Sequence, residues 1–184
     1  MNSMKPNDEG FTGLEAAIVL IAFVVVAAVF SYVVLGAGFF TTQKAQETVY
    51  KGVEQSTANI QMIGNVYGLS TDSQTISNIT FVIGLAPGAP AMDLTKMKIV
   101  FSTPATTPVI LTNGNTSSTS VFTTKIGGTT VTSLNANDQV EIYFGVAGVT
   151  ANTKMNFELR PAVGAALPFS KTAPATITAT NVLY

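Results

Sequence analysis

The chain has 184 residues, of which 47% are hydrophobic and 10% charged, and its formal net charge is -1. It contains no His, Cys or Trp, which excludes thiol nucleophiles, Ser-His-Asp relays, Cys/His zinc sites and disulfide frameworks. Its Lys+Arg count of 9 against an Asp+Glu count of 10 offers no basic surplus for nucleic-acid phosphates. We therefore expect no enzyme, no cofactor, no metal and no nucleic-acid partner.

The N-terminal region changes from polar to apolar at Gly10-Phe11. A short leader, residues 1–10, is followed by a segment from Ala16 to Gln43 that has no charged residue. About 20 apolar residues span a bilayer as a helix, whereas the apolar part of a cleaved secretory signal is about 7 to 15 residues long. The sequence therefore predicts a membrane-spanning helix.

The helical pattern continues beyond the uncharged segment. Apolar residues recur at spacings that are mostly three or four, at Ala45, Val49, Val53, Ile60 and Ile63. Such spacing describes one face of a helix. We therefore predict one helical region over residues 11–68, which at 1.5 Å per residue is on the order of 80 Å long.

The remainder, residues 69–184, has the composition of a β domain. Short runs rich in Thr, Val, Ile and Phe alternate in polarity at 96–101, 140–144 and 155–160, which is typical of strands with one buried face. Gly127-Gly128 between residues 119–126 and 129–134 predicts a tight hairpin. The predicted fold class is α+β, a long apolar helix followed by an all-β sandwich or barrel-like, immunoglobulin-like domain.

Two kinds of polar motif occur in the β region. Oxygen-bearing side chains gather at 135–141, but their spacing matches no EF-hand loop, and we interpret them as a polar turn in which Asp138 opens a strand. Asn78-Ile79-Thr80 and Asn115-Thr116-Ser117 are acceptor sequences for N-glycosylation in a secreted chain. Asn115 is the favoured acceptor because its neighbours predict an exposed loop.

The N-terminal arrangement resembles a known family. A leader that ends in Gly10, an aromatic Phe11, Glu15 at the fifth position after Gly10 and an unbroken apolar helix together resemble the class III signal peptide of type IV pilin-like proteins. The block TGLEAAIVLIAFVVVAAVFSYVVLGAGFF is most similar to archaeal flagellins (archaellins). The later segments SLNANDQVEIYF and FELRPAVGAALPFSKTAPATI are also similar to that family.

The resemblance implies a filament protein of the archaeal flagellum (archaellum). A prepilin-type signal peptidase would cut between Gly10 and Phe11 while the precursor is in the cell membrane. The mature chain would then form an extracellular helical homo-oligomer, with or without paralogous subunits, with its helices inside and its β domains outside. Glu15 would pair with the new amine at Phe11, and the apolar centre of the helix, with Val25 and Val29, would carry assembly.

Other interpretations remain open from the sequence. Glu15 also fits the first turns of a helix, where the helix dipole favours an acidic residue. The apolar helix could be a permanent membrane anchor instead of a filament core. The corresponding alternative functions are a type IV adhesion pilin and a monomeric single-span surface protein whose β domain binds sugars or partners.

Overall fold

The computed structural model describes the backbone from residue 8 and the side chains from residue 13. Most of the predicted leader, residues 1–7, and the side chain of Phe11 therefore lie outside the described residues. The chain divides into two compact units, one that ends at Tyr50 and one that covers Lys51–Tyr184.

Helix α1 runs over Asp8–Thr57 and accounts for 50 residues. It is the one helix in the described part of the chain that is long and apolar enough to cross a membrane, judged by length and composition. Thr41 and Thr42 in this helix donate their hydroxyls to the carbonyls of Ala37 and Gly38, four residues earlier. These bonds lower the cost of placing the two hydroxyls in an apolar environment.

The prediction that the helix continues to Gly68 is wrong. The helix ends at Thr57, and Ile60–Leu69 form strand β1. Ile60 and Val66 point into the β domain and are buried, while Gly64 adopts a φ of 76° where the pairing register between β1 and β2 shifts. The apolar spacing in this segment therefore comes from two stretches of strand in which buried and exposed side chains alternate, joined by this irregularity, and not from one face of a helix. The β domain therefore begins before the predicted boundary at residue 69.

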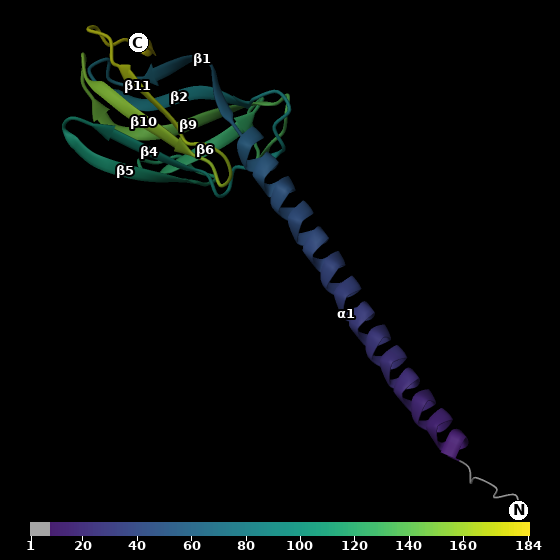
Figure 1. Ribbon diagram of the computed structural model, residues 1–184. Helices are drawn as coiled ribbons and strands as arrows, with labels where there is room; N and C mark the ends of the chain where they lie inside the picture. The colour runs from purple at the N-terminus through teal and green to yellow at the C-terminus, as the bar shows by residue number, and fades with distance from the viewer. Residues whose placement is uncertain (1–7) are drawn as a thin grey trace, which may run out of the picture. The chain divides into compact units, whose positions relative to one another are not determined.

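The β domain is built mainly from one large sheet (Figure 1). The strand order is β11-β10-β4-β5-β6-β9-β2-β1-β12, with β7 paired to β6, and β3 and β8 form a separate two-stranded sheet. All pairs are antiparallel except β5 with β6. The strands after β1 are β2 (Ile76–Leu85), β3 (Met92–Asp93), β4 (Lys98–Thr103), β5 (Thr106–Asn113), β6 (Val121–Ile126), β7 (Thr129–Thr130), β8 (Ser133–Leu134), β9 (Gln139–Val149), β10 (Lys154–Arg160), β11 (Leu167–Thr172) and β12 (Thr180–Leu183).

The two end strands of the sheet approach each other. The backbone N–H of Thr172, at the end of β11, donates to the carbonyl of Tyr184 at 2.7 Å, and the N–H of Tyr184 donates back to the carbonyl of Thr172 at 3.1 Å. This reciprocal pair nearly closes the sheet into a barrel. The predicted fold, a long apolar helix followed by a barrel-like β domain, is confirmed.

Phenylalanines fill the interior of the barrel. Phe81 contacts Phe144 and Phe157 edge to face with ring centroids 6.4 Å apart, and Phe157 stacks on Phe169 at 4.8 Å. Offset and edge-to-face contacts of this kind add about 0.5–1.5 kcal/mol each beyond the area that they bury. The alternating strands therefore enclose one continuous aromatic core.

The predicted hairpin is present between β6 and β7. Gly127 and Gly128 have φ values of 56° and 87°, the two positive angles that a tight two-residue turn of this class needs.

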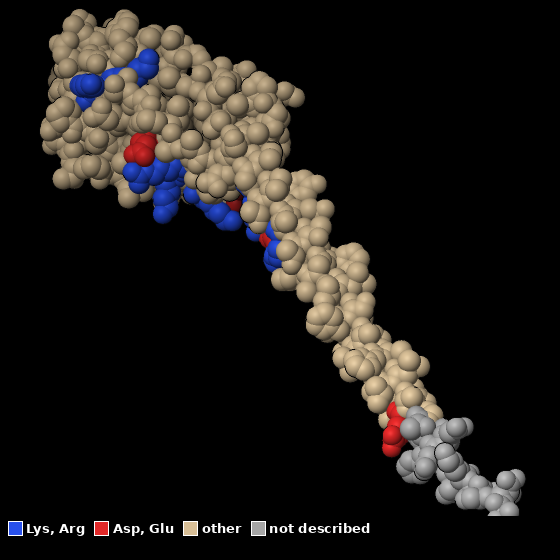
Figure 2. All heavy atoms as spheres, in the orientation of Figure 1, with Lys and Arg blue, Asp and Glu red and all other residues tan. Residues whose placement is uncertain are grey.

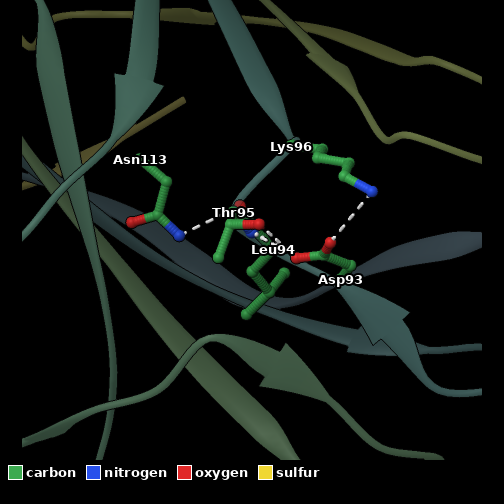
Figure 3. A network of polar contacts seen from close by, with 5 residues as sticks. All are labelled: Asp93, Leu94, Thr95, Lys96 and Asn113. Atoms are coloured by element: carbon green, nitrogen blue, oxygen red, sulfur yellow. Dashed lines mark hydrogen bonds and ion pairs between the residues drawn. The ribbon is translucent and has the colours of Figure 1, made fainter.

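A polar network holds the segment that follows β3 (Figure 3). Asp93 accepts a hydrogen bond from the N–H of Thr95 and forms an ion pair with Lys96 at 3.6 Å. Asn113, at the end of β5, donates its amide to the carbonyl of Leu94 at 2.9 Å. The network fixes Leu94 in the core, where its side chain is fully buried.

Candidate assembly surface

Helix α1 presents an exposed apolar surface. Every large apolar side chain of α1 for which an exposure is known lies between 53% and 80% exposed. Soluble monomers rarely expose a contiguous apolar patch of more than a few hundred Å². These residues are Leu14, Ile18, Val19, Leu20, Ile21, Phe23, Val24, Val25, Val26, Val29, Phe30, Tyr32, Val33, Val34, Leu35, Phe39, Phe40, Val49, Tyr50 and Val53.

Charges on the described helix lie towards its two ends. Between Glu15 and Lys44 there is no charged residue, which corresponds to about 42 Å of helix at 1.5 Å per residue. Figure 2 shows this uncharged length on the face that it presents. Lys44 forms an ion pair with Glu47 at 2.7 Å. The apolar surface is therefore bounded by polar groups at both ends.

A shallow groove runs along part of α1 where Gly38 has no side chain. It is lined by Phe30, Val34, Gly38 and Thr42, which follow one another at intervals of four residues, together with neighbouring side chains. A Cβ added at Gly36 or Gly38 would meet no atom within 4 Å. Small residues at such spacing allow another helix backbone to approach closely. Because α1 continues unbroken through these glycines, close packing explains them better than a kink does.

The predicted assembly residues all lie on this surface. Val25 and Val29 are 55% and 60% exposed, in the uncharged part of α1. Glu15 is exposed near its N-terminal end. Gly10 belongs to the helical backbone, but the structure describes no side chain at Phe11, so the predicted cleavage point and its amine stay predictions.

The two glycosylation sequences lie in different settings. Asn115 is exposed in the loop between β5 and β6, whereas Asn78 is half-buried within β2, with β1 and β9 on its two sides. An oligosaccharide-transferring enzyme needs an accessible asparagine. The structure therefore favours Asn115 on accessibility.

The polar turn before β9 is held by its own side chains. Asn135 donates its amide to the carboxylate of Asp138 at 2.8 Å, and the N–H of Asp138 donates to the carbonyl of Asn135 at 3.1 Å. Glu141 instead accepts from the hydroxyl of Thr80 at 2.8 Å. Within the described residues, no group of three or more acidic side chains is placed to hold a metal ion.

Sequence comparison decides the family. The sequence model described as archaeal-type flagellin matches residues 10–171. The chain belongs to the archaeal-type flagellin family. It is 38% identical to the probable flagellin 1 of Archaeoglobus fulgidus, over 96% of each chain. It is 91% identical to the 24 kDa flagellin of Methanospirillum hungatei over 32 residues. These aligned residues make up 17% of this flagellin and all of the other sequence.

Solved structures agree with this assignment. The archaeal flagellum of Methanospirillum hungatei strain JF1 superposes with a TM-score of 0.75 at 33% identity, covering 94% of this flagellin and 99% of that chain. A crystal structure of an archaeal flagellin from Methanocaldococcus jannaschii shares the fold, with a TM-score of 0.57 at 14% identity over 68% of this chain and 96% of that one. The helix followed by a β domain is thus the fold that this chain shares with the subunit of the Methanospirillum hungatei flagellum.

Proposed function

We propose that this flagellin is a structural subunit of the archaeal motility filament, a homopolymer outside the cell, and that it polymerises through α1. The observation that carries the proposal is the uncharged, exposed apolar length of α1 in a chain of the flagellin family. Burial of apolar surface contributes about 25 cal/mol per Å². Packing of many such helices against one another therefore provides the main assembly energy. The role is structural, and no catalytic step is assigned to it.

The same helix accounts for a membrane-inserted precursor. Its uncharged part exceeds the roughly 30 Å of a bilayer's hydrocarbon core. Removal of residues 1–10 by a prepilin-type signal peptidase would take Lys5, Asp8 and Glu9 away from the end of the helix, where burial without partners is costly. The intact mass of filament protein should begin at Phe11. A filament subunit that retains Met1 would contradict this maturation step.

Cleavage would create an amine beside a carboxylate. With Phe11 as the first residue, its ammonium group lies about one helical turn from Glu15 and can pair with this side chain in the same or a neighbouring subunit. A buried carboxylate without a partner costs several kcal/mol, so the pair would set the axial position of each helix. Glu15→Gln should assemble more slowly than Glu15→Asp, measured by turbidity of refolding subunits. Equal rates would remove the pairing role.

A charge placed in the apolar length tests the assembly role directly. Val25→Asp should abolish filaments, because a charge at the centre of an apolar helix costs about 2.5–3.5 kcal/mol on insertion scales. Val25→Ile is the matched control and should assemble normally. Electron microscopy of sheared cells and immunoblots of membranes give the readouts. Normal filaments from the Asp variant would favour the rival function, a single-span surface protein in which α1 is only an anchor.

The β domains would form the outer, hydrated layer of the filament. Asn115 is the proposed glycan acceptor because its side chain is exposed in a loop. Peptide mass spectrometry of native filaments should find a glycan at Asn115 in preference to Asn78. A fully unmodified Asn115 would refute the assignment.

A further inference from the structure

The large sheet has a gap between β5 and β9. Both strands flank β6 in the strand order, but β6 pairs with β5 only through residues 121–122, and its pairing with β9 starts at residue 122. Residues 106–111 of β5 and 145–149 of β9 therefore lie on the two sides of a position that β6 does not reach. The loop between β5 and β6 closes one end of this gap, where the N–H of Gly145 donates to the carbonyl of Ser118 at 3.1 Å.

A cavity of about 210 Å³ is lined by residues from both sides of this gap. Its floor consists of three buried apolar side chains, Phe101, Val146 and Val149, none more than 7% exposed. The small residues Ala105 and Ala147 also line it, and none of the lining residues is charged. An apolar cavity of about 150 Å³ is already large enough to stay dry and bind benzene. The space therefore accommodates one small ring.

Threonine hydroxyls lie at the mouth of the cavity. The hydroxyl oxygens of Thr103 and Thr106, at the turn between β4 and β5, are 2.8 Å apart. Those of Thr150 and Thr153, at the turn between β9 and β10, are 3.0 Å apart. All four side chains line the cavity and are more exposed than its floor. In each pair one hydroxyl donates to the other, so the second keeps a proton that it can donate to a ligand.

We propose that the cavity between β5 and β9 binds a small neutral molecule with an apolar ring and one hydroxyl group, which is the chemistry of a phenol. The ring lies on Phe101 and the two valines of the floor, and the hydroxyl group meets one of the two threonine pairs at the mouth. The site is separate from the apolar surface of α1. It therefore adds a binding role to the β domain that does not depend on polymerisation.

The same features argue against other classes of ligand. A charged ligand would lose its hydration without meeting an opposite charge, because none of the lining residues is charged. A sugar ring carries several hydroxyl groups, and those that face the apolar floor would be left without hydrogen-bond partners. A plain hydrocarbon fits the floor but gains nothing from the threonine pairs.

Site-resolved NMR of the full chain tests the inference. With α1 held in detergent micelles and the sample dialysed against reservoirs of known p-cresol concentration, the amide signals of Gly145 and Gly148 should shift and saturate. Ala147→Leu should weaken binding by roughly tenfold or more, because the larger side chain takes the space that the ring needs. Ala175→Leu, at an exposed position outside the cavity, is the matched control and should bind as the unmodified chain does.

Toluene separates the hydroxyl contact from simple apolar filling. At equal free concentration p-cresol should bind at least as tightly as toluene, although its hydroxyl group costs more to remove from water. Replacement of Thr103 and Thr150 together by valine should reverse this order. A dispersed amide spectrum shows that each variant is folded.

Each outcome supports or overturns a stated part of the inference. Absence of saturable shifts in the unmodified chain, or equal binding by Ala147→Leu, would overturn the site. Tighter binding of toluene to the unmodified chain, or an unchanged order in the Thr103→Val/Thr150→Val variant, would overturn the ligand class. None of these measurements requires filaments, so a negative result would leave the proposed function untouched.

Discussion

The position of β1 predicts where the β domain can be separated from the helix. A fragment that starts at Lys51 keeps β1 and should be a folded monomer, because it lacks the apolar length of α1. A fragment that starts at Ser70, where the sequence pattern alone would place the domain, lacks β1. We expect this shorter fragment to be unfolded or strongly destabilised.

The expected loss of stability follows from the residues that β1 covers. Ile76 and Leu183 stay in the shorter fragment, but both are buried, and they lie against Gly68 and opposite Val66 of β1. Full exposure of two such side chains costs about 3–6 kcal/mol, at about 1.5–3 kcal/mol each. Loss of the ladder to β2 and β12 adds about 0.5–1.5 kcal/mol for each hydrogen bond. The sum is comparable to a whole domain's stability of about 5–15 kcal/mol.

Thermal unfolding followed by circular dichroism, together with sedimentation velocity, measures both fragments. The longer fragment should unfold cooperatively as a monomer. The shorter fragment should show no cooperative transition or a much lower Tm. An equal Tm for the two fragments would refute the reasoning, and polymerisation of the longer fragment would show that α1 is not the main source of assembly energy.

Two further predictions concern the β domain. Gly164→Ala should destabilise the domain by more than about 1–3 kcal/mol, because φ is 102° and the new Cβ would lie 1.7 Å from the carbonyl oxygen of Ala58. Gly88→Ala is the matched control, since Gly88 has a φ of 83° but open space around it. Equal losses of stability for the two variants in chemical unfolding would contradict a steric contact. Backbone N–H donors of Thr75 and Gln74 and the hydroxyl of Ser70 hold the pKa of Asp72 well below its usual range. Asp72→Asn should therefore lower Tm at pH 7. A carboxyl group whose pKa is lower in the folded than in the unfolded state stabilises the fold above the unfolded-state pKa, and this stabilisation is lost as the native carboxylate is protonated, so the difference in Tm from the unmodified chain should shrink as the pH falls below about 4. A difference in Tm that does not depend on pH would contradict this.

Much of the fold could be predicted because its signals are local. The uncharged apolar run at 16–43 is far longer than a strand and therefore indicates a helix, and the Gly127-Gly128 turn needs only its own two positive φ values. Alternation in β10 likewise placed Met155, Phe157 and Leu159 on the buried side. In each case the residues that decide the structure are next to one another in the sequence.

The end of the helix could not be predicted because it depends on distant strands. Ile60 and Ile63 continue the helical spacing of Val49 and Val53, yet β2 and β12 convert this segment to a strand by offering it two hydrogen-bonded neighbours. The irregularity at Gly64 hides the alternation of β1. The pairing of β1 with β12 could not be predicted for the same reason, since Tyr67 and Val182 are far apart in the chain and only the sheet register makes them neighbours.

The reciprocal hydrogen bonds between Thr172 and Tyr184 have a consequence for a protein made in many copies. A sheet with open edges offers rows of unpaired N–H and C=O groups onto which strands of other molecules can add, which leads to fibrous aggregates. Here Tyr184 pairs with Thr172 across that edge. One end of that edge is thereby closed to strands of other subunits, so crowded subunits have fewer free backbone groups through which they could stack.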